Sequence, residues 1–166
     1  AWALQRAIAK AGYDVVTDSF PRCFPSFWAN NIDRAKRIVA HYLLGRKSVD
    51  PFPYYVNSRN WERISVNTKE FVRNNIAVVD FFEGQTMPSR DMIESFDTFV
   101  VGSDQVWRDS YGRVESYFCD FAKSTNKKRI AYAASFGLGN WQFDNKRTEN
   151  IKALADEFQA ISVREN

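Results

Sequence analysis

Histidine and cysteine are scarce in this 166-residue chain, which contains only His41, Cys23 and Cys119. A zinc site needs several such residues close together, and a local Ser-His-Asp triad needs a histidine near its partners, so both kinds of centre are nearly excluded. The two cysteines have no CxxC spacing and are typical of reduced, buried thiols in a cytosolic protein. No signal-peptide pattern and no apolar run long enough to cross a bilayer is present. These absences predict a soluble, cytoplasmic segment.

A large excess of one charge is also missing. The 23 Lys and Arg residues against 20 Asp and Glu residues give a net charge of +3, too little to indicate a nucleic-acid-binding protein. One basic cluster runs from residue 33 to residue 47, with five cations and one acid: Arg34, Lys36, Arg37, Arg46, Lys47 and Asp33. A basic amphipathic helix of this kind either lies on an anionic membrane surface or presents a solvated face, and both interpretations stay open.

Aromatic residues are abundant, with 14 Phe, 7 Tyr and 5 Trp, and hydrophobic residues make up 45% of the chain. A chain of this length buries roughly two-thirds of its unfolded surface, so it needs no disulfides to fold. There is no internal repeat and no low-complexity segment. We therefore expect residues 1–166 to form a single domain with a large core.

Helices and strands are predicted to alternate along the chain. The spacing of apolar residues predicts helices over residues 1–11, 32–43, 61–73 and 145–158, and a short helix capped by Ser89. Short apolar runs predict strands over residues 13–17, 76–79, 97–101, 129–134 and 160–163, while residues 18–31 and 81–88 are predicted to be irregular. This alternation indicates an α/β fold: a mostly parallel sheet with helices on both faces.

Small, polar or charged residues follow three of the predicted strands: Gly102, Ser103 and Asp104; Ser135 and Gly137; Arg164 and Glu165. Because ligands bind beyond the carboxyl ends of parallel strands, we expect these residues to share one edge and one pocket. A hydroxyl or carboxylate there can bind a sugar, and Arg164 can hold a carboxylate or phosphate through two parallel hydrogen bonds. The same residue types also suit turns and caps; Asp104 in particular can cap a helix that begins at Gln105.

Several sequence motifs together carry a family resemblance. In chain order they are AWALQRAIAKAGYDV at 1–15, VGSDQVW at 101–107, YFCDF at 117–121, RIAYAASFG at 129–137 and ISVRE at 161–165. Their order and spacing resemble the polysaccharide pyruvyl transferase family over essentially the whole chain. Two positions depart from the family pattern: Arg108 stands where Asn is usual, and Cys119 where Leu is common. Neither departure removes an obvious catalytic group.

The resemblance implies a Rossmann-like fold, as the N-terminal domain of a GT-B-like enzyme with two domains. In that family a strand and an Asn/Gly-rich loop precede the AWALQ-like helix, and a second Rossmann-like domain follows. The active site lies in the cleft between the domains. We therefore expect the first strand and the second domain to lie outside this chain, and we expect the chain expressed alone to be inactive.

The implied reaction transfers a pyruvyl group from phosphoenolpyruvate to two hydroxyls of one sugar, giving a cyclic ketal. Arg164 is expected to neutralise the donor's carboxylate or phosphate, and Asp104 to orient or deprotonate a sugar hydroxyl, as the catalytic residues. The expected substrate-binding residues are Gly102, Ser103, Gln105, Trp107, Ser135, Phe136, Gly137 and Glu165. The general acid for the enol carbon is expected to be a His of the second domain, since His41 lies in none of the motifs.

The resemblance implies a sugar of a cell-surface polysaccharide, or its lipid-linked oligosaccharide precursor, as the acceptor. The donor, phosphoenolpyruvate, is a substrate; no cofactor and no metal is expected, and no nucleic acid. Among the five tryptophans, Trp107 is the one expected to face a ligand. Two other functions stay open: a GT-B glycosyltransferase that uses a nucleotide sugar, and a non-catalytic carbohydrate-binding module.

Overall fold

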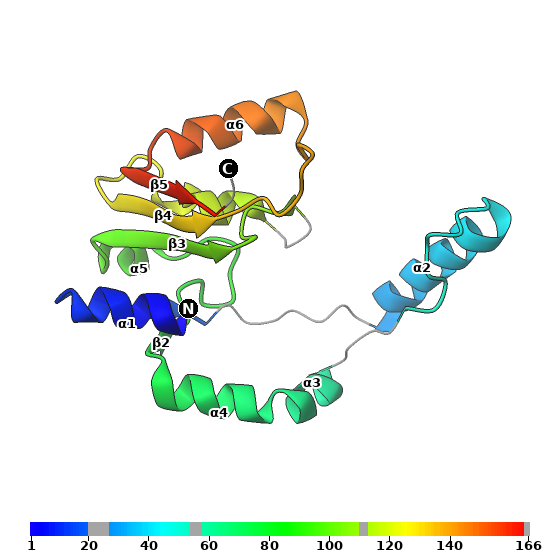
Figure 1. Cartoon of the computed structure of the whole chain (residues 1–166), viewed down its shortest axis with the longest axis horizontal. Coiled ribbons are helices and arrows are strands. Elements are labelled where there is room, and N and C mark those ends of the chain that lie inside the picture. The colour runs from blue at the N-terminus through cyan, green and yellow to red at the C-terminus, as the bar shows by residue number, and fades with distance from the viewer. Residues whose placement is uncertain (20–26, 54–57, 110–112, 165–166) are drawn as a thin grey trace. The chain divides into compact units, whose positions relative to one another are not determined.

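The computed structural model describes residues 1–19, 27–53, 58–109 and 113–164, and within residues 27, 58, 59 and 103 only the backbone. The chain consists of two compact units, Ala1–Asp80 and Phe81–Asn166, which are described one at a time below. Figure 1 shows the elements of each unit. Both units contain parallel strands, which confirms the mixed α/β class predicted from the sequence.

In the first unit, helix α1 (Trp2–Lys10) is attached to a small sheet of β1 (Thr17–Asp18) and β2 (Val78–Val79), which pair in parallel. The buried side chain of Gln5 makes this attachment. Its Nε2 donates to Thr17 Oγ1 at 3.0 Å and to the Ala77 carbonyl oxygen at 2.8 Å, while Oε1 accepts from the Ala77 amide at 3.1 Å. The predicted strand at 13–17 was therefore placed too early, because pairing with β2 begins only at Thr17.

The other helical segments that the structure describes in this unit are α2 (Phe27–Ile38), the π-helix η1 (Val39–Leu43), α3 (Ser58–Ile64) and α4 (Val66–Asn75). The irregular connection predicted up to residue 31 is wrong from residue 27, because the prolines precede α2 and a helix can begin shortly after a proline. The helix predicted over 61–73 is divided between α3 and α4. At the division, Ser65 Oγ donates to the Trp61 carbonyl oxygen at 2.5 Å.

The second unit is built on a three-stranded parallel sheet in the order β3-β4-β5. Its strands are β3 (Thr98–Asp104), β4 (Lys128–Ala134) and β5 (Ala160–Val163), and their arrowheads point the same way in Figure 1. Helix α6 (Asn145–Ala155) connects β4 to β5, as a crossover between parallel strands requires. The strand predicted to end at 101 continues to Asp104, which brings Gly102 and Ser103 into β3.

Within the described residues, shorter helices that accompany this sheet are α5 (Arg90–Glu94) and the 3₁₀ segments η3 (Val114–Phe118) and η4 (Asp120–Ala122). Ser89 caps α5 as predicted, since its Oγ accepts from the Met92 amide at 3.3 Å. Asp144 caps α6 in the same way, accepting from the Arg147 amide at 2.8 Å.

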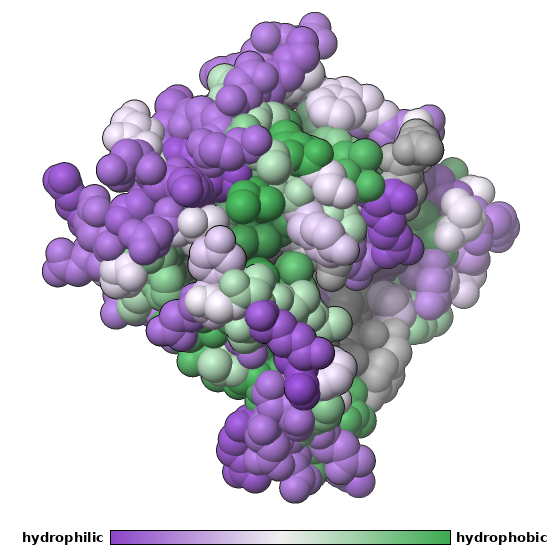
Figure 2. All heavy atoms as spheres, turned by 60° about the vertical axis from the view of Figure 1, so that its left-hand side comes forward, coloured by the Kyte–Doolittle hydropathy of each residue, from purple (hydrophilic) through white to green (hydrophobic). Residues whose placement is uncertain are grey.

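The core of the second unit lies between the sheet, α6 and η3. It contains Trp107, Val114, Phe118, Ala131, Ala134, Phe143, Ile151 and Leu154, all buried. Because alternate strand residues face opposite sides, Val100 and Tyr132 belong to the other face of the sheet, and both are exposed. Helices on both faces of the sheet therefore remain a prediction. Figure 2 shows one face of the molecule, where hydrophobic residues reach the surface among hydrophilic ones.

Candidate functional site

The carboxyl ends of β3, β4 and β5 lie side by side. Ala134, the last residue of β4, pairs with Asp104 on one side and with Val163 on the other. Beyond it, the Ser135 amide donates to the Asp104 carbonyl oxygen at 3.0 Å, and the Arg164 amide donates to the Ala134 carbonyl oxygen at 3.2 Å. The shared edge expected from the sequence is therefore present.

Asp104 and Arg164 meet across the end of β4. Asp104 Oδ1 lies 3.4 Å from Arg164 Nη1, and the two side chains are 71% and 56% exposed. An exposed ion pair with a single long contact stabilises a fold by only about 0–1 kcal/mol. The pair therefore contributes little to folding, and an anionic ligand can compete with Asp104 for the guanidinium.

The backbone is irregular at this edge. Gly102 has φ +141° and Asp104 has φ +132°, Ala133 has φ +50°, and the register between β4 and β5 shifts between Ala131 and Ala134. At Gly102 a β-carbon would overlap the carbonyl oxygen of Tyr132, so no other residue fits there without displacement of β4. Non-glycine residues in such conformations cost of order 1–3 kcal/mol each and cluster at functional sites.

The two aromatic residues expected to bind a ligand, Trp107 and Phe136, pack against each other. Trp107 is 3% exposed, its ring stacks on Phe118 at 4.8 Å, and its Nε1 donates to the Tyr117 carbonyl oxygen at 3.1 Å. Phe136 is half-buried and packs against the same indole at 5.3 Å. In this structure Trp107 is thus a core residue whose N–H is satisfied, and its expected contact with a ligand stays a prediction that the burial of the ring does not support.

Ser135 stabilises a turn, which is the alternative role that the sequence left open for it. Its side chain is buried, and Oγ accepts from the Gly137 amide at 2.8 Å, which closes the turn after β4. Asp104, by contrast, does not cap a helix, because it is the last residue of β3 and no helix begins at Gln105. For Ser103 only the backbone is described, and Glu165 lies outside the described residues.

The turns after β3 and β4 are bonded to each other. The Trp107 amide donates to the Ser135 carbonyl oxygen at 3.2 Å, and Gln142 bridges from the Asp109 amide at 3.4 Å to the Phe136 carbonyl oxygen at 3.3 Å. Gln105 lies at the same place, and its Oε1 accepts from Arg108 Nη1 at 3.0 Å. Arg108 thus orients one of the predicted substrate-binding side chains, a role that its sequence position alone did not indicate.

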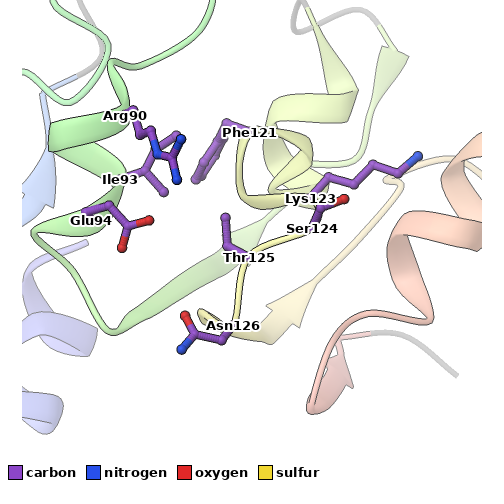
Figure 3. Close-up of a pocket in the computed structure, with 8 residues that line it drawn as sticks. All are labelled: Arg90, Ile93, Glu94, Phe121, Lys123, Ser124, Thr125 and Asn126. Carbon is purple, nitrogen blue, oxygen red and sulfur yellow. The ribbon is translucent and has the colours of Figure 1, made fainter.

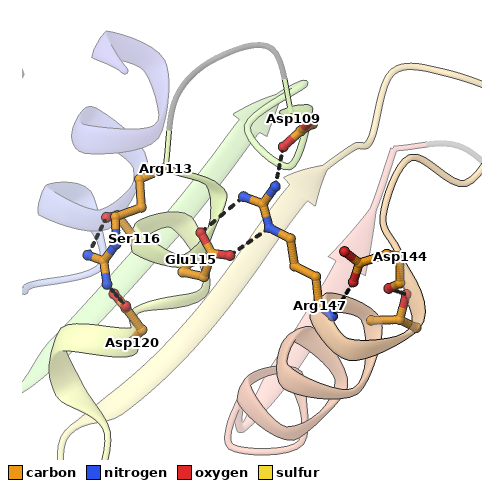
Figure 4. A network of polar contacts seen from close by, with 8 residues as sticks. Asp109, Arg113, Glu115, Ser116, Asp120, Asp144 and Arg147 are labelled. Atoms are coloured by element: carbon orange, nitrogen blue, oxygen red, sulfur yellow. Dashed lines mark hydrogen bonds and ion pairs between the residues drawn. The ribbon is translucent and has the colours of Figure 1, made fainter.

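Arg147, in the first turn of α6, binds two carboxylates of the segment that follows β3 (Figure 4). Its Nε and Nη2 donate to Glu115 at 2.7 and 3.2 Å, Nη1 donates to Asp109 at 2.5 Å, and the guanidinium lies 5.0 Å from the centre of the Phe143 ring. The hydrogen bond from Arg147 lowers the pKa of Glu115 below its usual value. Sequence reasoning missed this network because its partners are 32 and 38 residues apart.

A separate cavity of about 470 Å³ lies at the segments that lead into β3 and β4. Arg90, Ile93 and Glu94 of α5 point toward Phe121 and Thr125 across it (Figure 3). Because β3 and β4 are each seven residues long, this cavity lies roughly 20 Å from the carboxyl edge. It therefore belongs to the opposite end of the sheet from Asp104 and Arg164.

The buried thiol of Cys119 is unsuited to nucleophilic chemistry. Burial raises its pKa to about 12, so the reactive thiolate is nearly absent at neutral pH. Cys23 lies outside the described residues. Within the part of the chain that the structure describes, no group of three or more His, Cys, Asp or Glu side chains is placed to hold a metal ion.

The comparisons with known proteins give one match. A family model described as polysaccharide pyruvyl transferase matches residues 1–166, the whole chain. No curated protein and no solved structure matches the chain.

Proposed function

Since this chain belongs to the polysaccharide pyruvyl transferase family, an enzyme family, we propose that it takes part in the transfer of a pyruvyl group from phosphoenolpyruvate to one sugar. The sugar is part of a cell-surface polysaccharide or its lipid-linked precursor. Two sugar oxygens form bonds to C2 of the donor, and the bond from C2 to the phosphate ester oxygen breaks. One hydroxyl proton is balanced by the proton added to the methylene carbon, and the other leaves with phosphate.

The observation that best supports this proposal is the exposed pair of Arg164 and Asp104 at the carboxyl edge of the sheet. Phosphoenolpyruvate carries a carboxylate and a phosphate, and a guanidinium binds either group with two parallel hydrogen bonds. Arg164 holds Asp104 by one contact of 3.4 Å, which a donor anion can replace with a stronger, bidentate one. Neutralising charge that shifts during transfer is the role we assign to Arg164.

Asp104 then becomes available to the acceptor. A carboxylate released from its ion pair can accept a hydrogen bond from a sugar hydroxyl and take its proton as the oxygen attacks. Gln105 follows Asp104 directly in the chain and Gly137 packs against the Gln105 side chain, so both are proposed to bind substrate with this pair. Gly102, Ser103 and Glu165 keep the same proposed role from the sequence, and Ser135 contributes through the turn that it closes.

We further propose that the two units are parts of one Rossmann-like domain in a GT-B-like enzyme, since each carries parallel strands of the predicted kind. The proposed location is the cytoplasmic side of the membrane, where a lipid-linked acceptor would present its sugar. We propose that a group other than Asp104, Arg164 and the substrate-binding residues named above supplies the proton to the enol carbon.

The test is an assay of the longest natural polypeptide that contains this chain. Phosphoenolpyruvate is supplied with a panel of lipid-linked and nucleotide-linked sugars, and both phosphate release and the carboxyethylidene group on the sugar are measured. We expect both products, and only when an acceptor is present. Absence of ketal with every acceptor, together with thermal stabilisation by nucleotide sugars and none by phosphoenolpyruvate, would replace this proposal with a glycosyltransferase.

The roles of the pair are tested in the same assay. Arg164→Ala is expected to lower kcat/KM for phosphoenolpyruvate by about 100-fold or more, and Arg164→Lys by less, because Lys keeps the charge but loses the bidentate geometry. Lys152→Ala is the matched control, since Lys152 is an exposed cation on α6 that pairs with Glu149. Full turnover in Arg164→Ala would remove Arg164 from the site.

A further inference from the structure

Large hydrophobic side chains are exposed together along α2 and η1. They are Trp28, Ile32, Val39, Tyr42 and Leu43, and Leu44 follows directly. Their exposed fractions range from 44% for Val39 to 78% for Leu43. Single exposed hydrophobics are normal on a protein surface, but a contiguous set marks an interaction site.

The spacing of most of these residues places them on one side of the helix. In α2, Ile32 follows Trp28 by four positions, and Val39, directly after α2, follows Ile32 by seven, separations that share a face of an α-helix. In the π-helix η1 the Leu44 amide donates to the Val39 carbonyl oxygen at 3.1 Å, so Leu43 and Leu44, four and five positions after Val39, lie on its side. We name these residues, together with the neighbouring exposed Tyr42, the apolar stripe: Trp28, Ile32, Val39, Tyr42, Leu43 and Leu44.

Cations accompany the apolar stripe. Lys36 lies on α2, and Arg46 and Lys47 follow the end of η1; all three side chains are exposed. The chain turns back after η1, because the Arg46 amide donates to the Ala40 carbonyl oxygen at 2.9 Å and His41 Nδ1 lies 2.7 Å from the Val49 carbonyl oxygen. This turn keeps Arg46 and Lys47 next to the end of the stripe. Asp33, the one acid in the segment, is paired with Arg37 at 2.6 Å.

We infer that α2 and η1 dock on an anionic lipid bilayer, with the apolar stripe in the interface and Lys36, Arg46 and Lys47 toward the headgroups. An amphipathic helix with Trp and Leu on one face and Lys and Arg beside it is suited to this position. Charge complementarity favours a bilayer of anionic lipids over an uncharged one. The helices do not cross the bilayer: among the described residues, no helix is both long and apolar enough to do so.

This inference is independent of the proposed reaction, because binding is measured without donor or acceptor. The natural polypeptide is sedimented with vesicles of phosphatidylcholine alone and with vesicles that also contain phosphatidylglycerol. We expect binding to the anionic vesicles, weaker binding to the neutral ones, and loss of binding as the salt concentration rises. Equal binding to both vesicles, or binding to neither, would overturn the inference.

Substitutions in the apolar stripe and at the neighbouring cations test which residues contact the bilayer. The double variant Leu43→Ser/Leu44→Ser is expected to weaken binding by about tenfold or more, because two large apolar side chains no longer enter the interface. The double variant Lys36→Gln/Lys47→Gln is expected to weaken binding to anionic vesicles by about fivefold for each charge removed. Its binding to neutral vesicles should not change. The matched controls are Ile64→Ser, 66% exposed on α3, and Lys69→Gln/Lys152→Gln, which should bind as the unchanged protein does.

Two further measurements test whether something other than a bilayer covers the apolar stripe. If Leu43→Ser/Leu44→Ser lowers the melting temperature, another part of the polypeptide covers the stripe. If it converts an oligomer to a monomer in light scattering, a second copy covers it. Either result, or vesicle binding that all four variants leave unchanged, contradicts the membrane inference. Unaltered melting and oligomeric state, with vesicle binding reduced as above, support it.

Discussion

Gly137 packs directly against the side chain of Gln105: a β-carbon at position 137 would lie 2.5 Å from Gln105 Cδ. The backbone of Gly137 also has φ +69°, in the left-handed region. This contact joins the turn after β4 to the turn after β3, beside Asp104. The candidate site therefore depends on a glycine both for conformation and for space.

Gly137→Ala should consequently destabilise the protein and disturb the site. Adding a methyl group at positive φ and against Gln105 is expected to lower the free energy of unfolding by about 1–3 kcal/mol. Gly139→Ala is the matched control, since no atom lies within 4 Å of the added carbon and its φ is not positive. Urea denaturation of both variants makes the measurement; equal stabilities would show that Gln105 moves aside without cost.

Arg147 is predicted to be the main link between α6 and the segment that follows β3. Arg147→Met keeps much of the packing over Phe143 but removes the bonds to Glu115 and Asp109, so the free energy of unfolding should fall by about 1–3 kcal/mol. A double-mutant cycle with Glu115→Gln should give a coupling energy of about 1 kcal/mol or more. The exposed ion pair of Lys152 with Glu149, treated in the same way, should give a coupling near zero.

The three strands that form the candidate edge could be predicted because each is a short apolar run followed by small, polar or charged residues. β5 was located at its observed bounds, Ala160–Val163, and β4 to within one residue. The strands of the first unit were less well located: β1 and β2 are two residues each, so pairing and not hydrophobic pattern fixes where they begin.

Side-chain positions at the site were harder to predict than the strands. Asp104 and Arg164 follow from strand ends and register alone. The burial of Trp107 depends on Phe118 and Phe136, and the placement of Gln105 depends on Arg108 and Gly137. The contact of Gly137 with Gln105 joins two turns that are distant in sequence, the burial of Trp107 is a choice between solvent and core, and the bond from Arg108 depends on the side-chain conformation of a turn. None of these is expressed in a local hydrophobic pattern.

The lowered pKa of Glu115 predicts a pH dependence of stability. A carboxyl whose pKa is lower in the folded state contributes stability above its unfolded pKa, here 4.5, and loses that contribution as pH falls through the folded value. The difference in unfolding free energy between the unchanged protein and Glu115→Gln should therefore be constant near neutral pH and shrink below pH 4.5. Urea titrations of both proteins across this range give the measurement. A difference that grows on acidification would contradict the assigned role of Arg147.

The raised pKa of Cys119 predicts an unreactive thiol in the native protein. With a pKa near 12 against 9.0 for a free thiol, the thiolate fraction at neutral pH falls by about a thousandfold, and burial blocks access as well. In a Cys23→Ser background, a disulfide reagent should label the native protein very slowly and the urea-unfolded protein at the rate of a free cysteine. Labelling of the native protein should also keep accelerating toward pH 12, whereas a free thiol is already half ionised at pH 9.0 and its rate levels off above that pH. Rapid native labelling at neutral pH would mean that η3 and η4 open readily, and that the core around Phe118 is less stable than its burial indicates.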